Sequence, residues 1–389
     1  MLSRLTPKHY LSPEIFAREQ QNIFRKLWLF ACFRTALAEP GAFVTRSMAG
    51  LPVLLRNCDG EIRAFENQCP HRQMALHIEP FGQARMVCPY HGWVFAEDGK
   101  VKTIPHESTL YAYSAQEREA LCLRRYSVAV IGNLVFVNLD TDPLPLERQF
   151  TPEFQAALAD ISSHFGALSV HSDTRVRYNW KLNHENVMDG NHIAYVHPKT
   201  FQPFLRAGEL AAKKQDTASM PEPAAEPLAT ERTLSAQSGW TRTPMQIAPA
   251  AWHADMERYG FGGGDGDCEG EEGDADYFHT FTVYPNVNFI SPGGLSFIAQ
   301  QFEPVAPGET QLRMTLTLAR ERRRMPGLPA LLRAYLKGET AVVREDIVAL
   351  EALQAGLHEG SRPARHGRYE DRLQAHADVY LDMLEGHLP

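Results

Sequence analysis

Two short segments, each with one cysteine and one histidine, constrain this chain more than any other feature. Cys69-Pro70-His71 is followed, after residues 72–87, by Cys88-Pro89-Tyr90-His91. Thiolate and imidazole groups are the usual protein ligands of zinc and of iron–sulfur centres. A zinc finger usually pairs two cysteines in one segment and two histidines in the other, whereas here each segment carries one of each. This distribution suits two metals, one held by both cysteines and the other by both histidines.

That ligand set is the arrangement of a Rieske [2Fe–2S] cluster, in which imidazole ligands raise the reduction potential relative to an all-thiolate cluster. Such a centre suits one-electron donation to oxygen chemistry. A zinc site with mixed ligands and four unconnected core residues are the two alternatives. The other cysteines, Cys32, Cys58, Cys122 and Cys268, are expected to be inert.

A second group of candidate ligands lies in the segment NWKLNHENVMDGNHIAYVHP at residues 179–198. Its His192 and His197 are five positions apart, about 140° around a continuous helix. Both can face one metal only if the helix loosens or ends between them, and Pro198 favours a helix end nearby. Asp189 lies three positions before His192, close to the same face, where a carboxylate can orient a ligating imidazole.

Two histidines need one carboxylate to complete the facial triad of non-haem Fe(II) oxygenases. The segment REDIVALEALQAGL is predicted to be helical and offers two adjacent acids, Glu345 and Asp346, about 100° apart. Asp346 shares a face with the apolar residues Leu350 and Leu353, so we select it as the third ligand. Glu345 and Glu351 are expected to lie on the solvated face.

Composition sets the class of protein. The 389 residues include 39 Lys plus Arg and 47 Asp plus Glu, a formal net charge of −8, and 44% are hydrophobic. These values predict a globular chain of two or three domains, or one large domain, and argue against a nucleic-acid binder. The longest apolar-looking stretch, residues 126–139, is too short to span a bilayer, and no secretory signal is visible. We therefore expect a cytoplasmic protein that does not bind membranes.

Local patterns indicate how the chain is organised. Residues 12–35 are predicted to form an amphipathic helix, and residues 40–140 a compact all-β module. Within that module, residues 126–139 are predicted to form a strand pair that turns at Gly132-Asn133. Strands return at 277–319 and helices from about 326, whereas stretches 211–237 and 260–276 are predicted to be surface loops.

These motifs together resemble the large (α) subunit of Rieske non-haem iron oxygenases, the ring-hydroxylating oxygenases. The resemblance covers nearly the whole chain. It rests on FENQCPHR at 65–72, CPYHGWVFAEDGK at 88–100, NWKLNHEN with the following Asp189, His192 and His197, YPN at 284–286, and the helix with Glu345 and Asp346. The chain departs from the family pattern at Gln73, where members often have glycine, and at Asn191, where many have tyrosine.

The resemblance implies an α+β fold. Residues 40–150 would form an N-terminal all-β Rieske [2Fe–2S] domain. It would be inserted into a helix-grip-like catalytic domain with an antiparallel sheet, made of the helical residues 1–39 and of residues 151–389. The ligands that the resemblance implies are Cys69, His71, Cys88 and His91 for the cluster, and His192, His197 and Asp346 for a mononuclear Fe(II).

The resemblance also implies O2-dependent oxidation with electrons from NADH, passed by a reductase partner directly or through a ferredoxin. Three α subunits of this family form a head-to-tail ring, with or without a small β subunit. In that ring Asp189 would bridge His91 of one subunit to His192 of the next. Asn186, one helical turn from Asp189, would line the substrate pocket.

The substrate stays open at this point, because one iron site serves cis-dihydroxylation, monohydroxylation and oxidative demethylation in this family. Hydroxylation of an aromatic substrate, an aromatic acid in particular, is our leading hypothesis. One alternative is a monooxygenase or demethylase for a quaternary ammonium or methylated amine held by an aromatic cage. The others are a Rieske electron carrier without oxygenase activity and a zinc-stabilised binding module.

Overall fold

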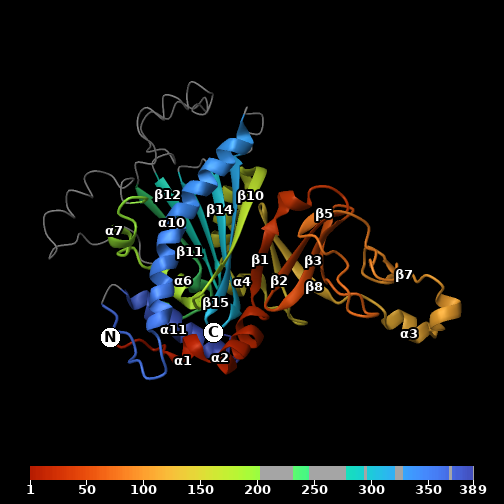
Figure 1. The fold of residues 1–389 in the computed structure, drawn as a ribbon, viewed down its shortest axis with the longest axis horizontal. Helices are drawn as coiled ribbons and strands as arrows, with labels where there is room; N and C mark the ends of the chain where they lie inside the picture. Colours follow the sequence, from red (N-terminus) through yellow and green to blue (C-terminus); the bar gives the residue numbers. More distant parts are fainter. Residues whose placement is uncertain (202–230, 245–276, 293–295, 320–326, 368–369, 389) are drawn as a thin grey trace. The chain divides into compact units, whose positions relative to one another are not determined.

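The computed structural model describes residues 1–201, 231–244, 277–292, 296–319, 327–367 and 370–388. The chain forms two compact units, Glu19–Gln149 and a second one made of Met1–Arg18 and Phe150–Pro389 (Figure 1). The N-terminal unit begins before residue 40 because strand β1 (Trp28–Phe33) belongs to its sheet. The predicted loop at 260–276 and most of the one at 211–237 lie outside the described residues.

The unit Glu19–Gln149 is built on a seven-stranded sheet in the order β1-β9-β8-β4-β3-β2-β5, with a separate two-stranded sheet β6-β7. Its elements are the π-helix η1 (Gln20–Phe24), β1, η2 (Arg34–Leu37), β2 (Ala42–Met48), β3 (Leu51–Cys58), β4 (Glu61–Glu66), β5 (Phe81–Gln83), β6 (Val94–Phe95), β7 (Val101–Thr103), η3 (Glu107–Tyr111), α3 (Ala115–Ala120), β8 (Arg125–Ile131), β9 (Leu134–Asn138) and α4 (Leu146–Gln149).

The predicted strand pair at 126–139 is confirmed: β8 and β9 pair antiparallel on either side of Gly132-Asn133. The predicted helix at 12–35 is wrong beyond Phe24. The sequence WLFACF forms β1 instead, and every one of its residues is buried. Because β1 pairs with β9, a strand more than a hundred positions away, its conformation is decided by a partner that local periodicity does not reveal.

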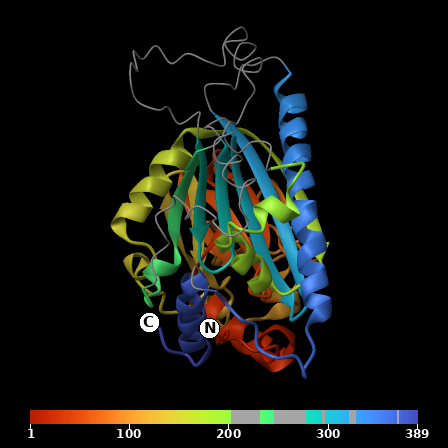
Figure 2. The ribbon, with the colours of Figure 1, turned by 90° about the vertical axis from the view of Figure 1, so that its left-hand side faces the viewer.

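The second unit contains a six-stranded antiparallel sheet in the order β10-β15-β14-β13-β12-β11 (Figure 2). Its elements are α1 (Lys8–Leu11), α2 (Pro13–Glu19), α5 (Pro152–Ser163), β10 (Phe165–Val176), α6 (Trp180–Met188), α7 (Ile193–Val196), η5 (Ser235–Gln237), β11 (Gly239–Pro244), β12 (Tyr277–Val283), β13 (Val287–Pro292), β14 (Ser296–Ala306), β15 (Glu309–Ala319), α10 (Leu328–Gly356) and α11 (Asp371–Leu384). The strands expected at 277–319 and the helices expected after 326 are therefore confirmed.

The long helix α10 lies along this sheet, with α6 and α7 beside it (Figures 1 and 2). Leu328 and Leu332 on α10 pack against Ile298 and Leu316 of the sheet. Burial of such side chains contributes about 1.5–3 kcal/mol each, which fixes the rotation of α10 about its axis. The residues of α10 that face α6 and α7 are thereby placed as well. Among the described residues, none of the helices is both long enough and apolar enough to cross a bilayer.

Helix α6 is anchored by a buried lysine. The Lys181 side chain is fully buried, and its Nζ lies 5.1–5.3 Å from the ring centroids of Tyr10, Trp180 and Tyr380. Such cation–π contacts replace part of the hydration that the ammonium loses. Asn179 caps the helix by accepting a hydrogen bond from the backbone N–H of Lys181 at 3.0 Å.

Two further imidazoles are buried between α6 and α11. The ring centroids of His184 and His376 lie 4.2 Å apart, and the Tyr284 ring meets both edge-on. Burial, with the charge of Arg372, lowers the pKa of His184 to about 3. Burial, followed by the neighbouring His184, holds the pKa of His376 well below its ordinary value. Both rings are therefore neutral in the folded protein.

We expect this pair to make an acid-sensitive contribution to the stability of the second unit. The unfolded chain takes up protons near pH 6.5 and the folded rings do not, so the contribution of the pair is complete above pH 6.5 and falls as the pH drops towards 3. Burial raises the pKa of Glu185 and of Glu339 to about 7, and these two carboxyls act in the opposite direction. A single histidine contributes at most about 1.4 kcal/mol per pH unit in that window. Urea unfolding at constant ionic strength between pH 7.5 and 5 measures the slope. The His376→Phe variant should show a shallower slope, and an unchanged slope would contradict this account.

Candidate metal centres

Cys69 and Cys88 begin two loops with the same backbone pattern in the N-terminal unit. In each loop the cysteine N–H donates to the carbonyl of the fifth residue along, and the cysteine carbonyl accepts from the N–H of the fourth, at 2.8–3.0 Å. That fourth residue has a positive φ, 59° at Gln73 and 71° at Gly92. The two segments recognised in the sequence thus fold as a matched pair of turns.

The side chains of these loops meet as a cysteine pair and a histidine pair. Cys69 and Cys88 are buried, and the ring centroids of His71 and His91 are 4.6 Å apart. Burial raises the pKa of the Cys69 thiol, and the adjacent Cys88 thiol raises it further, so metal binding must displace protons here. The Nδ1 atoms of both histidines are buried without a hydrogen-bond partner. Two thiols and two unsatisfied imidazole nitrogens fit the donor set of a Rieske cluster.

Aromatic side chains hold His71 in place. The Trp93 ring stacks on it with centroids 4.9 Å apart and an interplanar angle of 2°, and Tyr111 meets it edge-on at 5.4 Å. Trp93 belongs to the buried core that also contains both cysteines. The contacts with Trp93 and Tyr111 therefore orient the ring of one candidate ligand.

In the second unit, one helical turn separates the two candidate histidines, and the helix ends at the second of them. Helix α6 ends at Met188, and α7 is a single turn. His192 is the N-cap residue of α7 and His197 its C-cap, with φ −112° and ψ 43° outside the helical region. The two rings are consequently 5.3 Å apart, centroid to centroid, on the same side of the turn.

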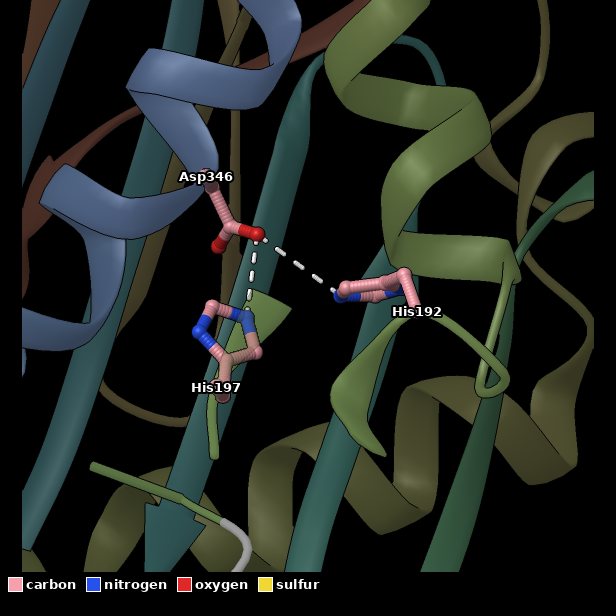
Figure 3. A group of neighbouring side chains, drawn as sticks. All are labelled: His192, His197 and Asp346. Carbon is pink, nitrogen blue, oxygen red and sulfur yellow. Dashed lines mark ion pairs between the residues drawn. The ribbon is translucent and has the colours of Figure 1, made fainter. Parts of the chain in front are cut away.

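Asp346 of α10 reaches both rings (Figure 3). Its Oδ1 lies 3.0 Å from Nε2 of His197 and 3.6 Å from Nε2 of His192. One ligand atom from each of the three residues lies within 4.8 Å of the others, and this is the only such group of three among the described residues. His197 is 3% exposed, whereas His192 and Asp346 are 17% and 18% exposed. The three donors fit a mononuclear metal of the two-histidine, one-carboxylate type.

Asn186 and Asp189 support this group from α6. The Asn186 amide donates to Oδ1 of Asp346 at 3.2 Å, so it contacts the candidate ligand directly. Asp189 caps the end of α6, and its Oδ1 accepts from the backbone N–H of Asn191 at 2.8 Å. Its Oδ2 lies 3.8 Å from Nδ1 of His192, within ion-pair distance but too long for a hydrogen bond.

The expectation that Glu345 faces solvent is wrong. Its Oε2 lies 2.9 Å from Nδ1 of His197 and accepts a hydrogen bond from the Thr200 hydroxyl. The Thr200 hydrogen bond, with those of His197, lowers the pKa of Glu345. Burial by itself would lower the pKa of His197, but the hydrogen bonds and charges of Asp346 and Glu345 raise it. The 100° step between the two acids turns Glu345 towards α7 rather than towards water.

Two other details of α10 differ from the expectation. Glu351 accepts hydrogen bonds from the backbone and guanidinium of Arg177, so it is not a purely solvated residue. Leu353 is 57% exposed, whereas Leu350 and Val343 are buried. The apolar stripe that orients Asp346 therefore continues from Leu332 through Val343 to Leu350, and it ends one turn earlier than the sequence suggested.

Comparisons with known proteins follow the same division of the chain. The Rieske [2Fe-2S] domain matches residues 27–114. The catalytic domain of the ring hydroxylating alpha subunit matches residues 160–386, more than half of the chain. The chain belongs to the ring-hydroxylating oxygenase α subunits. Its domains are therefore those that carry a Rieske cluster and a mononuclear iron, and the predicted α+β fold is confirmed.

Individual relatives act on different substrates. The large oxygenase component of the naphthalene 1,2-dioxygenase system of Pseudomonas putida is 32% identical over 218 residues, 53% of this chain and 47% of that protein. The carnitine monooxygenase oxygenase subunit of Acinetobacter pittii is 30% identical over 194 residues, 49% of this chain and 51% of that protein. The chain thus matches about half the length of these curated relatives.

Solved structures share the fold along nearly the whole chain. The quaternary ammonium Rieske monooxygenase CntA matches with a TM-score of 0.72 and 20% identity, over 98% of this chain and 94% of that one. Naphthalene 1,2-dioxygenase with indole bound matches with a TM-score of 0.68 and 19% identity, over 99% and 93%. At this level of identity the likeness concerns the fold alone.

The positive φ of Gln73 leads to a stability prediction. A side chain in the left-handed region costs about 1–2 kcal/mol, whereas glycine adds about 0.5–1 kcal/mol of unfolded-state entropy. Because the Gln73 side chain is exposed, Gln73→Gly should stabilise the N-terminal unit by about 0.5–1 kcal/mol. Thermal unfolding followed by the visible absorbance of the cluster measures this. The control Gln116→Gly, in helix α3, should destabilise. Destabilisation by both variants would contradict the interpretation.

Proposed function

We propose that this chain is the terminal oxygenase component of a Rieske oxygenase system that uses O2 and external electrons to hydroxylate an aromatic substrate. The observation that carries the proposal is the convergence of His192, His197 and Asp346, whose ligand atoms lie within 4.8 Å of one another. This constellation occurs in a chain that also brings two cysteines and two histidines together in its other unit. An electron carrier or a zinc-stabilised module has no use for the second centre, and the family membership argues against both.

In this proposal the protein supplies two sets of ligands. Cys69 and Cys88 hold one iron of the cluster, and His71 and His91 hold the other. His192, His197 and Asp346 hold the mononuclear iron. When bound, the cluster supplies single electrons and the mononuclear iron activates O2 beside the substrate. Three protein ligands leave the remaining positions of that metal accessible.

Two supporting residues have separate roles. Asn186 donates to Oδ1 of Asp346 and so keeps that carboxylate oriented towards the two rings. The pocket-lining role expected for Asn186 from the sequence stays part of the proposal. Asp189 is the residue that passes electrons between the cluster of one subunit and the iron of the next, through His91 and His192.

Aromatic compounds, aromatic acids in particular, are the substrate class that we propose first. Support comes from the naphthalene 1,2-dioxygenase relatives and from the anthranilate 1,2-dioxygenase large subunit of Acinetobacter baylyi, which is 29% identical over 202 residues. The second candidate is oxidation of a quaternary ammonium or methylated amine. It is supported by the similar identity to a carnitine monooxygenase oxygenase subunit. Aromatic side chains near the site, such as Phe201 and Phe278, suit either class.

The proposal includes partners. Electrons come from an NADH-dependent reductase, directly or through a ferredoxin, and the chain assembles as a homotrimer, with or without a small β subunit. We also propose a cytoplasmic location, because an NADH supply and the free cysteines of the described residues both fit a reducing compartment. Neither nucleic acid nor membrane belongs to this function.

Metal analysis tests the proposal directly. Purified chain should contain three irons and two acid-labile sulfides, and Asp346→Ala should retain two irons and both sulfides. Turnover with a surrogate reductase is then assayed on a panel of aromatic acids and methylated amines. Oxygen-dependent products in one group identify the substrate class. Two irons in the native chain, or zinc without sulfide, would refute the oxygenase function.

The relay role of Asp189 gives a further prediction. Asp189→Ala should keep both metal sites filled, since the residue provides no metal ligand, but it should slow electron transfer to the mononuclear iron severely. Single-turnover reoxidation of the reduced cluster with substrate and O2 measures that step. Asn191→Ala, which removes only the side chain of the residue whose N–H bonds to Asp189, is the control. A normal reoxidation rate in Asp189→Ala would rule out the relay.

A further inference from the structure

The two candidate iron histidines are held in very different ways. His192 has a buried Nδ1 with no hydrogen-bond partner among the described residues, and its nearest acid at that atom, Asp189, is 3.8 Å away. His197 is held at both nitrogens, with Nε2 at 3.0 Å from Asp346 and Nδ1 at 2.9 Å from Glu345. One ring is thus fixed within the chain, and the other has one nitrogen left for a partner.

The two acids that contact His197 have different roles. Asp346 approaches the nitrogen that points to the other two candidate ligands, so it is a co-ligand of the same metal. Glu345 approaches the opposite nitrogen and lies outside that group of three. An acceptor on the outer nitrogen of a ligating imidazole holds the N–H there, leaves the inner nitrogen unprotonated, and makes it a better donor.

We infer that Glu345 is the positioning residue of the mononuclear centre: it fixes His197 in the tautomer and orientation that present Nε2 to the metal. This inference rests on the proposed function. The interaction is built into the chain, because Glu345 is adjacent to Asp346 and the same rotation of α10 sets both side chains. The contact between Glu345 and His197 therefore couples the placement of His197 to that of Asp346.

Thr200 completes the arrangement. Its hydroxyl donates to Oε2 of Glu345, the same oxygen that accepts a hydrogen bond from Nδ1–H of His197. The hydroxyl anchors the carboxylate at the end of the turn that carries His197, so the acid cannot swing into water without breaking two hydrogen bonds. His197, Glu345 and Thr200 form one hydrogen-bonded chain, with the candidate ligand His197 at its inner end.

Metal affinity tests this inference without relying on turnover. Full-length variants are freed of mononuclear metal with a mild chelator, while visible absorbance confirms an intact cluster, and Co2+ binding is measured by anaerobic equilibrium dialysis. Glu345→Ala should raise the Co2+ dissociation constant about 10- to 100-fold. Glu345→Gln should recover part of the loss, because its amide oxygen still accepts from Nδ1–H. Thr200→Val should show a smaller loss than Glu345→Ala.

The control is Glu351→Gln, which makes the same change as Glu345→Gln on the same helix. Glu351 contacts Arg177 rather than a candidate ligand. The control variant should bind Co2+ like the native chain. Native affinity in Glu345→Ala, or an equal loss in Glu351→Gln, would overturn the role of Glu345. Asp346→Ala distinguishes a failure of the role of Glu345 from a failure of the proposed metal centre. If that variant binds Co2+ normally, the proposed metal centre itself is wrong; if it alone loses Co2+, the centre stands and the inference fails.

Discussion

A single carboxylate oxygen, Oδ1 of Asp346 on α10, joins that helix to α6 and α7, which lie far from it in the sequence. It is approached by the amide of Asn186, by Nε2 of His192 and by Nε2 of His197, from α6 and from both ends of α7. A metal at this position would take over the contacts with the rings, whereas the Asn186 hydrogen bond would continue to orient the carboxylate. The site is thus organised around the acid rather than around the histidines.

The rest of the second unit serves to hold that oxygen in place. A one-turn helix such as α7 has no stability of its own, because nucleation costs more than a single turn returns. It persists because α6 is anchored by the buried Lys181 on one side and α10 packs on the sheet through Leu328 and Leu332 on the other. The buried apolar contacts determine the distances between these helices, and the hydrogen bonds at the site determine the directions in which the ligand side chains point.

The sequence indicated the ligands better than their surroundings. The Cys–His spacing and the helix break before Pro198 are local, so they could be read from residue types and intervals. The role of Glu345 could not, because it depends on how far α10 is rotated when Leu328, Leu332 and Leu350 are buried. Strand β1 escaped prediction for a similar reason, since its partner β9 is distant in sequence. Side-chain chemistry is visible in a sequence, whereas relative placement depends on packing.

The difference in how the two histidines are held bears on the proposed homotrimer. A ring whose outer nitrogen already bonds to Glu345 cannot also bond to another subunit, whereas His192 retains its Nδ1 beside Asp189. If electrons arrive through Asp189, they must enter through the ring that is not held internally. Fixing His197 then has a second consequence: a shift of Asp189 or His192 would leave His197 and Asp346 held by their own contacts to Glu345 and Asn186.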